Sequence, residues 1–184
     1  MRLNKPLTTD RLLLRTLSGA DASDAYLAWM HNAEVNRFLE SRFSVPACVQ
    51  DLVNFIELVN ESADSLLLGI FLRKDDCHIG NIKIGPIVTR HARSEIGYLI
   101  GEHTYWGKGY ATEAIREVCR YGFEDLGLEK ITAGVYDTNK GSAKALLKAG
   151  FMHEATISSY VIFEGRRIDS SIFGLERLDR AVHN

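Results

Sequence analysis

The sequence predicts an α+β fold in which one mixed sheet carries helices, within a single domain over residues 1–184 and a core of about residues 7–176. Three observations lead to this class. The first third of the chain has apolar residues at helical spacing, the middle alternates as strands do, and the last part alternates strands with helices. The 184 residues suit one domain, and no repeat or linker divides them.

The N-terminal third is expected to hold one short strand and then helices. Residues 12–14 are apolar between two arginines, which is typical of a strand. Ser18 stands three residues before an aspartate, so we expect an amphipathic helix to begin there. A second short helix is expected to close near residues 36–40. A third, with Pro46 in its first turn, is expected to run to about residue 62.

The remainder is expected to be a strand meander followed by alternating helices and strands. Strands are predicted at residues 66–72, 79–84 and 95–100. A loop with glycines and aromatic residues, 101–109, precedes a helix over about 110–125 that Gly127 ends. There follow a strand at 131–135, a helix at 140–149 that Gly150 ends, and two strands near 151–163 and 168–175.

Composition excludes several classes of partner. Lys and Arg number 22, Asp and Glu number 24, the net charge is −2, and no block of five like charges occurs. This balance argues against nucleic acid and anionic membranes as partners. No apolar stretch approaches the ~18 residues that would span a bilayer, and no apolar segment follows the first cations, so no signal peptide is expected. We therefore expect a cytoplasmic protein with no membrane partner.

Neither the cysteines nor the histidines indicate a metal site. The three cysteines are widely spaced and form no CxxC pair, which favours reduced thiols over a disulfide or zinc framework. The six histidines show no HExxH or other close ligand spacing. We therefore expect no metal.

The segment that follows the predicted strand 95–100 is the most informative one. It reads Trp106-Gly107-Lys108-Gly109-Tyr110-Ala111-Thr112 and leads into a helix. A helix N-terminus has unpaired N–H groups and about half a positive charge, so a phosphate can bind where neighbouring side chains are small. The alternative is a loop whose glycines only supply positive φ. The spacing is not that of a Walker loop or of a dinucleotide-binding fingerprint.

Four ordered motifs carry a resemblance that covers about residues 7–175. They are Ser94-Glu95-Ile96-Gly97-Tyr98, the segment 105–114, Asn139-Lys140-Gly141-Ser142 with residues 148–151, and Gly165 with Asp169. With these motifs the sequence resembles the GCN5-related N-acetyltransferases (GNAT), in particular the branch that acetylates the N-terminal amines of ribosomal proteins. The resemblance implies a mixed, mostly antiparallel sheet of about seven strands with splayed central strands, flanked by about four helices.

The resemblance also implies a site for acetyl-CoA, the acyl donor. The loop and helix amides would hold its pyrophosphate, and the pantetheine arm would lie between the strands that end near Ile100 and begin near Ile131. The family's loop usually begins with Gln or Arg where this chain has Trp106, so one phosphate contact is absent. The expected coenzyme-binding residues are Tyr98, Leu99, Ile100, Trp106, Gly107, Lys108, Gly109, Tyr110, Ala111, Thr112, Asn139 and Ser142.

Acyl transfer to an amine needs a neutral nucleophile, a polarised carbonyl and stabilisation of the leaving thiolate. Glu95 is the candidate base, directly or through water, against the alternative of a solvated strand carboxylate. A backbone N–H around residues 99–100 is the candidate oxyanion donor. Many members of the family have a tyrosine acid seven residues after the motif Asn139, where this chain has Leu146. The branch that the chain resembles has serine three residues after that Asn, which implies Ser142 as the candidate hydrogen-bond donor or proton relay to the thiolate. Asn139 is expected both to cap the next helix and to contact pantetheine.

The acceptor is less defined than the donor. The resemblance implies direct transfer in a ternary complex to the N-terminal α-amine of a protein. The alternatives are a small amine, such as the amino group of a nucleotide-linked sugar, and a non-catalytic acyl-CoA-binding module. Residues 166–169 form either an exposed charged turn or part of the acceptor pocket, and Glu113 is expected to make a structural hydrogen bond. A homodimer, paired through an edge strand or the last hairpin, is a further candidate assembly.

Overall fold

The computed structural model describes residues 1–177 and has one sheet of eight strands in the order β1-β2-β3-β4-β5-β6-β8-β7. Residues 178–184, which the single-domain prediction includes, lie outside the described residues. The strands are β1 (Leu7–Thr8), β2 (Leu12–Thr16), β3 (Leu66–Leu72), β4 (His78–Ile84), β5 (Arg93–Ile100), β6 (Lys130–Tyr136), β7 (Met152–Phe163) and β8 (Arg166–Glu176). The α-helices are α1 (Asp24–His31), α2 (Ala33–Asn36), α3 (Val49–Glu61), α4 (Tyr110–Glu124) and α5 (Lys140–Ala149).

The predicted α+β class with a mixed, mostly antiparallel sheet is confirmed. All neighbouring strands run antiparallel except β5 and β6, which are parallel. The described residues form eight strands rather than about seven and five α-helices rather than about four. The strand that the sequence did not reveal is β1, because its two residues are too few to show a pattern.

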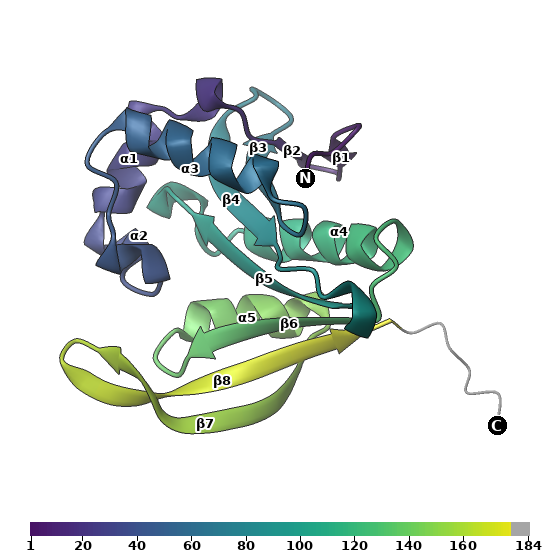
Figure 1. Ribbon diagram of the computed structural model, residues 1–184. Coiled ribbons are helices and arrows are strands. Elements are labelled where there is room, and N and C mark those ends of the chain that lie inside the picture. Colours follow the sequence, from purple (N-terminus) through teal and green to yellow (C-terminus); the bar gives the residue numbers. More distant parts are fainter. Residues whose placement is uncertain (178–184) are drawn as a thin grey trace.

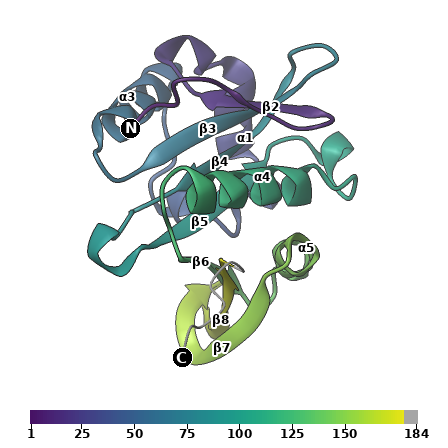
Figure 2. The same cartoon turned by 90° about the vertical axis from the view of Figure 1, so that its right-hand side faces the viewer.

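Helices cover both faces of the sheet (Figures 1 and 2). α4 packs on one face, where Ile115 joins a core that also contains Ile70 of β3. α1 and α3 pack on the other face, where Ile56 joins a second core with Leu67 of β3. All seven residues of β3 are therefore buried, which explains its unbroken apolar sequence.

The first helix starts later than predicted. Ser18 caps only a 3-10 turn, η1 (Gly19–Asp21). The N–H and hydroxyl of Ser18 both donate to the carboxylate of Asp21, at 2.8 and 2.9 Å, and this local turn ends the segment. α1 begins after Ser23, whose hydroxyl oxygen accepts from the N–H of Tyr26. The prediction of a helix from Ser18 is wrong because the aspartate bonds back within the turn.

The third helix also starts later than predicted. Pro46 lies outside α3, whose N-cap is Cys48. The carboxylate of Asp51 accepts from the N–H groups of Ala47, at 2.8 Å, and of Cys48, at 3.3 Å. Because Asp51 satisfies these donors, the helix begins beyond the proline.

Between α1 and α3 the chain forms the α2–η2 segment, which we define as residues 33–43. It consists of α2 and the 3-10 turn η2 (Glu40–Phe43). The amide of Asn36 donates to the carbonyl of Met30 at 2.9 Å and accepts from the hydroxyl of Ser41 at 3.0 Å. This buried side chain ends α2 at the lower bound of the predicted region 36–40 and fixes the turn that follows.

β7 is an edge strand with exposed apolar side chains. Register shifts interrupt its pairing with β8 between His153 and Ala155 and between Ile157 and Val161. Such bulges discourage an edge strand from pairing with another chain, so they argue against a dimer formed through β7. The homodimer stays a prediction. The exposed apolar residues of this strand are Met152, Ile157, Tyr160 and Ile162.

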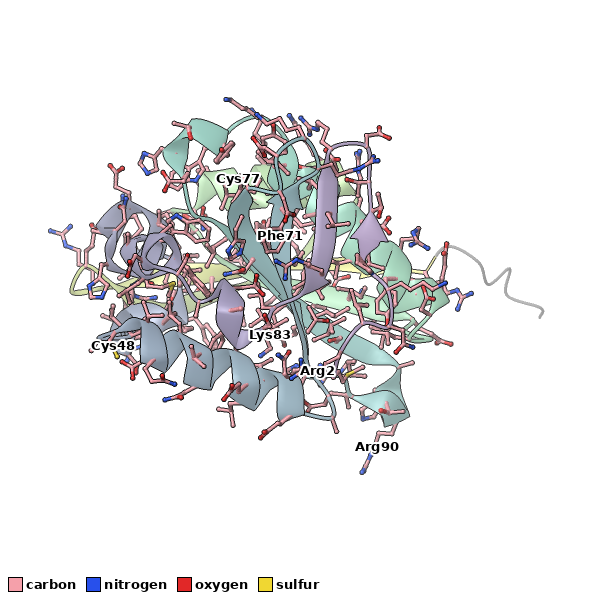
Figure 3. The ribbon with its side chains drawn as sticks, turned by 90° about the horizontal axis from the view of Figure 1, so that it is seen from above. Arg2, Cys48, Phe71, Cys77, Lys83 and Arg90 are labelled. Atoms are coloured by element: carbon pink, nitrogen blue, oxygen red, sulfur yellow. The ribbon has the colours of Figure 1, made fainter. Side chains whose placement is uncertain are left out.

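The cysteines lie apart from one another. All three are free, and Figure 3 shows Cys48 and Cys77 well apart, at the left edge and near the top of the view. Within residues 1–177, no three His, Cys, Asp or Glu side chains are grouped closely enough to hold a metal ion. No helix of that part of the chain has the length and apolar character needed to cross a membrane.

Candidate active site

The two parallel strands of the sheet diverge after a short contact. β5 and β6 pair only at Arg93 with Lys130, Ser94 with Ile131, and Glu95 with Thr132, and their ribbons then separate (Figure 1). We call the region beyond Glu95 the β5–β6 gap. The pantetheine arm of acetyl-CoA is predicted to lie between these same two strands.

Strand alternation decides which backbone groups face the gap. The carbonyl of Glu95 accepts from Gly85, and the N–H of Gly101 donates to Ile79, so the odd-numbered residues of β5 bond to β4. The N–H of Leu99 therefore points to β4. The N–H groups of Tyr98 and Ile100 point to the gap. Of the two candidate oxyanion donors, only Ile100 has the required direction.

The loop before α4 has the geometry that anion binding requires. Gly107 has φ 72° and Gly109, the N-cap of α4, has φ 84°. A Cβ at Gly107 would meet nothing within 4 Å, so the loop is open as well as left-handed. The first intrahelical bond runs from Glu113 to the carbonyl of Gly109, which leaves the N–H groups of residues 110–112 without an intrahelical partner. Lys108 and the dipole of α4 add positive potential there.

Side chains hold this loop in place. The indole N–H of Trp106 donates to the carbonyl of Ile100 at 2.8 Å, and the ring of His103 lies 4.1 Å from that indole. His103 pairs in turn with Glu34 of α2 at 2.9 Å. The guanidinium of Arg11 donates to the carbonyl of Lys108 at 3.0 Å. Trp106, predicted to contact the coenzyme, thus also ties the loop to the end of β5.

Glu113 has the structural role that the sequence indicated. Its carboxylate accepts from the hydroxyl of Thr9 at 2.6 Å and from the N–H and Nε of Arg11 at 3.0 and 2.7 Å. Burial opposes ionisation of Glu113, but these hydrogen bonds outweigh it and lower the pKa. The carboxylate therefore fixes the turn before β2 against the first turn of α4.

A surface pocket of about 580 Å³ lies beside this contact. It extends along the outer face of α4 from Gly109 and Thr112, and its charged lining comprises the cations Arg11, Arg116, Arg120 and Lys148 and the carboxylates Asp10, Glu113 and Glu117. Arg11 and Arg120 pair with Glu113 and Glu117, so an anionic ligand at the start of α4 would meet Arg116 and Lys148. A second pocket, of about 360 Å³, is lined by the end of α3, by Ser65 and by Lys83 of β4, which pairs with Gly97 of β5.

Tyr98, Asn139 and Ser142 meet where α5 begins. The side-chain oxygen of Asn139 accepts from the N–H of Ser142 at 3.1 Å, which confirms the predicted N-cap. The phenol of Tyr98 lies 2.8 Å from the hydroxyl of Ser142 and donates to its carbonyl at 3.1 Å. Burial raises the pKa of Tyr98 to about 12. These contacts bridge β5 and α5 beside the gap.

Glu95 lies on the opposite face of β5 from Tyr98. Its side chain is exposed, and within the described residues its carboxylate has no hydrogen-bond or ion-pair partner. A Cβ at Gly97 or at Gly134 of β6 would meet nothing within 4 Å. The carboxylate therefore faces open space beside the gap, where a proton acceptor reached directly or through water would have room.

The far end of the gap is walled by residues that the sequence did not single out. Arg42 of η2 donates to the hydroxyl of Tyr136 at 2.8 Å and to the carbonyl of Ile162 at 3.3 Å. The hydroxyl of Tyr136 donates to Glu40. Phe38 stacks on Phe163 at 5.2 Å between ring centroids. We call this set of contacts, between the α2–η2 segment on one side and the end of β6 and the β7–β8 hairpin on the other, the wall contact.

Local sequence holds no signal for the wall contact, because Arg42 and Tyr136 are 94 residues apart. An exposed ion pair, Arg37 with Glu164 at 2.7 Å, lies at its rim. In the hairpin, Asp169 accepts from the N–H of Ser159 at 2.9 Å and Arg167 donates to the carbonyl of Ser159 at 3.1 Å. These two residues therefore order the hairpin itself.

Comparison with known proteins agrees with this geometry. Residues 11–152 match the acetyltransferase (GNAT) domain family. An uncharacterised N-acetyltransferase of Bacillus subtilis, YoaA, is 36% identical over 172 residues, which cover 92% of this chain and 95% of that protein.

Two solved structures share the fold. Spermidine N-acetyltransferase from Vibrio cholerae, in complex with CoA and spermine, has a TM-score of 0.79 at 20% identity and covers 91% of this chain and 96% of its own. Ribosomal-protein-S5-alanine acetyltransferase from Vibrio fischeri has a TM-score of 0.79 at 16% identity, with 96% and 98% covered. The family match spans most of the chain and the YoaA likeness nearly all of it, so this protein belongs to the GNAT acetyltransferase family and is an N-acetyltransferase.

Proposed function

We propose that this protein transfers the acetyl group of acetyl-CoA directly to the N-terminal α-amine of a protein. One observation carries the proposal: an open, positively charged helix N-terminus and an unpaired carboxylate, Glu95, lie at the same β5–β6 gap. The first suits a diphosphate and the second suits an amine that must lose a proton. Acetyl-CoA is the substrate that presents both a diphosphate and a reactive thioester.

In this proposal the diphosphate binds the N–H groups of residues 110–112, with Gly107 and Gly109 giving room and Lys108 adding charge. The pantetheine arm then follows β5 past Trp106, Ile100, Leu99 and Tyr98 toward Asn139. Two contacts support this path: Trp106 bonds to Ile100 at the end of β5 near the start of α4, and Tyr98 bonds to Ser142 at the start of α5.

The chemistry then requires three groups at the thioester. The amine attacks the acetyl carbon, and Glu95 takes its proton directly or through a water molecule. The N–H of Ile100 donates to the oxygen that becomes negative. The C–S bond breaks, and the sulfur keeps the electron pair as a thiolate that the hydroxyl of Ser142 stabilises.

The environment of Glu95 favours an α-amine over a lysine or a polyamine. An α-amine is roughly a tenth neutral at pH 7, whereas a lysine is neutral in about one molecule in 2,500, so an exposed carboxylate suffices for the former. A polyamine needs several unpaired carboxylates, but Glu40 and Glu164 at the wall contact are already bonded to Tyr136 and Arg37. A ribosomal-protein acetyltransferase among the structural neighbours is consistent with this choice.

The second candidate acceptor is a small amine, such as an amino sugar linked to a nucleotide. The open space at Gly97 and Gly134 would admit it as readily as a peptide. The family also includes a neighbour that acts on spermidine, so the fold alone does not choose.

Thiol release from acetyl-CoA decides between these acceptors. The protein is assayed with peptides that have a free N-terminus, the same peptides with a blocked N-terminus and a free lysine, spermidine, and nucleotide-linked amino sugars. The proposal expects turnover only with free N-termini. Turnover with amino sugars alone would select the second acceptor, and no turnover with any amine while acetyl-CoA still binds would contradict transfer.

A further inference from the structure

α5 offers no acid of its own to the departing sulfur. Leu146, where many family members have tyrosine, is fully buried in the apolar core. One helical turn earlier, the hydroxyl of Ser142 contacts the phenol of Tyr98 at 2.8 Å. The phenol next to this face of α5 therefore belongs to Tyr98 of β5 and not to a residue of the helix.

Ser142 is held at three points. Its N–H donates to the side-chain oxygen of Asn139 at 3.1 Å, and its carbonyl accepts from the phenol of Tyr98 at 3.1 Å. Its hydroxyl meets the same phenol. These contacts hold the backbone and the hydroxyl oxygen of Ser142 in place, so the direction of the hydroxyl hydrogen is what can differ.

That hydrogen has two arrangements. A serine hydroxyl has one hydrogen to donate and can accept two. When the phenol donates to the carbonyl, the hydroxyl can donate to the phenol oxygen and offers nothing to the gap. When the phenol donates to the hydroxyl, the serine hydrogen is directed elsewhere. A thiolate in the gap favours the second arrangement because an anion is the stronger acceptor.

We propose that Tyr98 is a positioning residue that turns the hydroxyl of Ser142 toward the sulfur of the departing coenzyme. The inference rests on the proposed function. As the C–S bond breaks, the sulfur takes the electron pair, Ser142 donates a hydrogen bond to it, and Tyr98 donates to Ser142. Neither residue gives up its proton, and the proton of the amine leaves through Glu95. Because burial raises the pKa of Tyr98 to about 12, the phenol stays a donor throughout.

A double-mutant cycle tests the pair. Tyr98→Phe and Ser142→Ala should each lower kcat by about tenfold, as expected for a lost hydrogen bond to a charged group. The affinity for acetyl-CoA should stay within about twofold. The double variant should lose no more than Ser142→Ala alone, because Tyr98 acts only through Ser142. Tyr26→Phe, which removes another buried phenol, from α1, is the matched control and should leave kcat unchanged.

Titration of bound CoA gives a readout that a structural role would not move. The thiolate absorbs in the ultraviolet, so the pKa of the bound thiol can be followed directly. The protein and Tyr26→Phe should hold this pKa lower than Tyr98→Phe or Ser142→Ala does. Equal thiol pKa values in all four proteins, or additive losses of kcat in the double variant, would overturn the inference while leaving transfer intact. Absence of turnover in the unsubstituted protein would instead contradict the proposed function.

Discussion

The two ends of the β5–β6 gap are built in different ways. At the end where we propose that the coenzyme binds, the coenzyme end, the loop and the first turn of α4 occupy consecutive residues, and backbone groups make the site. At the end where we propose that the acceptor binds, the acceptor end, the wall contact joins Arg42 to Tyr136 across 94 residues, and the ion pair at its rim joins Arg37 to Glu164 across 127. Backbone geometry recurs wherever the fold does, whereas side-chain contacts between distant segments change freely. On the proposed function, this difference lets proteins of one fold share the donor acetyl-CoA and differ in their acceptors.

The largest effect is expected from blocking the coenzyme end. Gly109→Val places a branched side chain over the N–H groups of residues 110–112 and should weaken acetyl-CoA binding by about a hundredfold or more. Calorimetric titration measures this. Gly127→Val is the control for backbone strain, because Gly127 also has positive φ but lies beyond the other end of α4. A Cβ would meet nothing within 4 Å at Gly127 and only the guanidinium of Arg11, at 3.5 Å, at Gly109. If Gly109→Val binds like the control, the phosphate lies elsewhere.

Glu95, where the gap opens, should affect turnover but not the affinity for acetyl-CoA or for the acceptor. Glu95→Gln should lower kcat by about a hundredfold below pH 7, and the deficit should shrink toward pH 8, where an α-amine loses its own proton. The pH profile of kcat measures this. Glu176→Gln, also exposed but at the end of β8, should leave the profile unchanged. An unaltered profile for Glu95→Gln would remove the carboxylate from the mechanism.

The wall contact sharpens the comparison from the acceptor side. Arg42→Ala removes bonds to Tyr136 and to the carbonyl of Ile162 and should raise the KM for the acceptor about tenfold, with acetyl-CoA affinity unchanged. Arg37→Ala, which breaks only an exposed ion pair, should change KM by less than about twofold. Steady-state kinetics with each substrate varied in turn measures both. Weaker acetyl-CoA binding in Arg42→Ala would show that the two ends are not independent.

The smallest effect is expected on the free energy of unfolding, through His78, which packs close to the coenzyme end. The ring of His78 stacks on Phe71 at 4.6 Å and lies 5.0 Å from Trp29, whose indole donates to Glu102 in the loop. Burial lowers the pKa of His78. The unfolded chain therefore binds more protons just below pH 6.5, so the free energy of unfolding should fall as the pH drops through that value.

Denaturant unfolding between pH 7.5 and 5 measures this slope, for which His78→Gln is the comparison. The variant should be less stable at pH 7.5 and should lose part of the pH dependence. Parallel curves for the two proteins would show that His78 does not titrate with unfolding.

How much of the site the sequence predicts follows from the same contrast. The left-handed glycines at 107 and 109 and the Asn139 cap depend on residues within a few positions of each other, so a local pattern identifies them. Phe38 stacks half-buried on Phe163 at the wall contact, and no residue near Phe38 in the sequence indicates that partner. The prediction that α1 begins at Ser18 failed for a different reason. A serine three residues before Asp21 fits the start of a helix and also a short turn, and in the structure the hydrogen bond from Ser18 to Asp21 closes a turn.

The central claim is that the diphosphate of acetyl-CoA binds the amides at the start of α4. The most direct measurement is a titration of isotopically labelled protein with acetyl-CoA, followed through its backbone amide resonances. The largest shifts should fall on residues 107–112, with smaller ones at Tyr98, Ile100 and Ser142. Shifts centred on other segments, or none at millimolar coenzyme, would contradict the account.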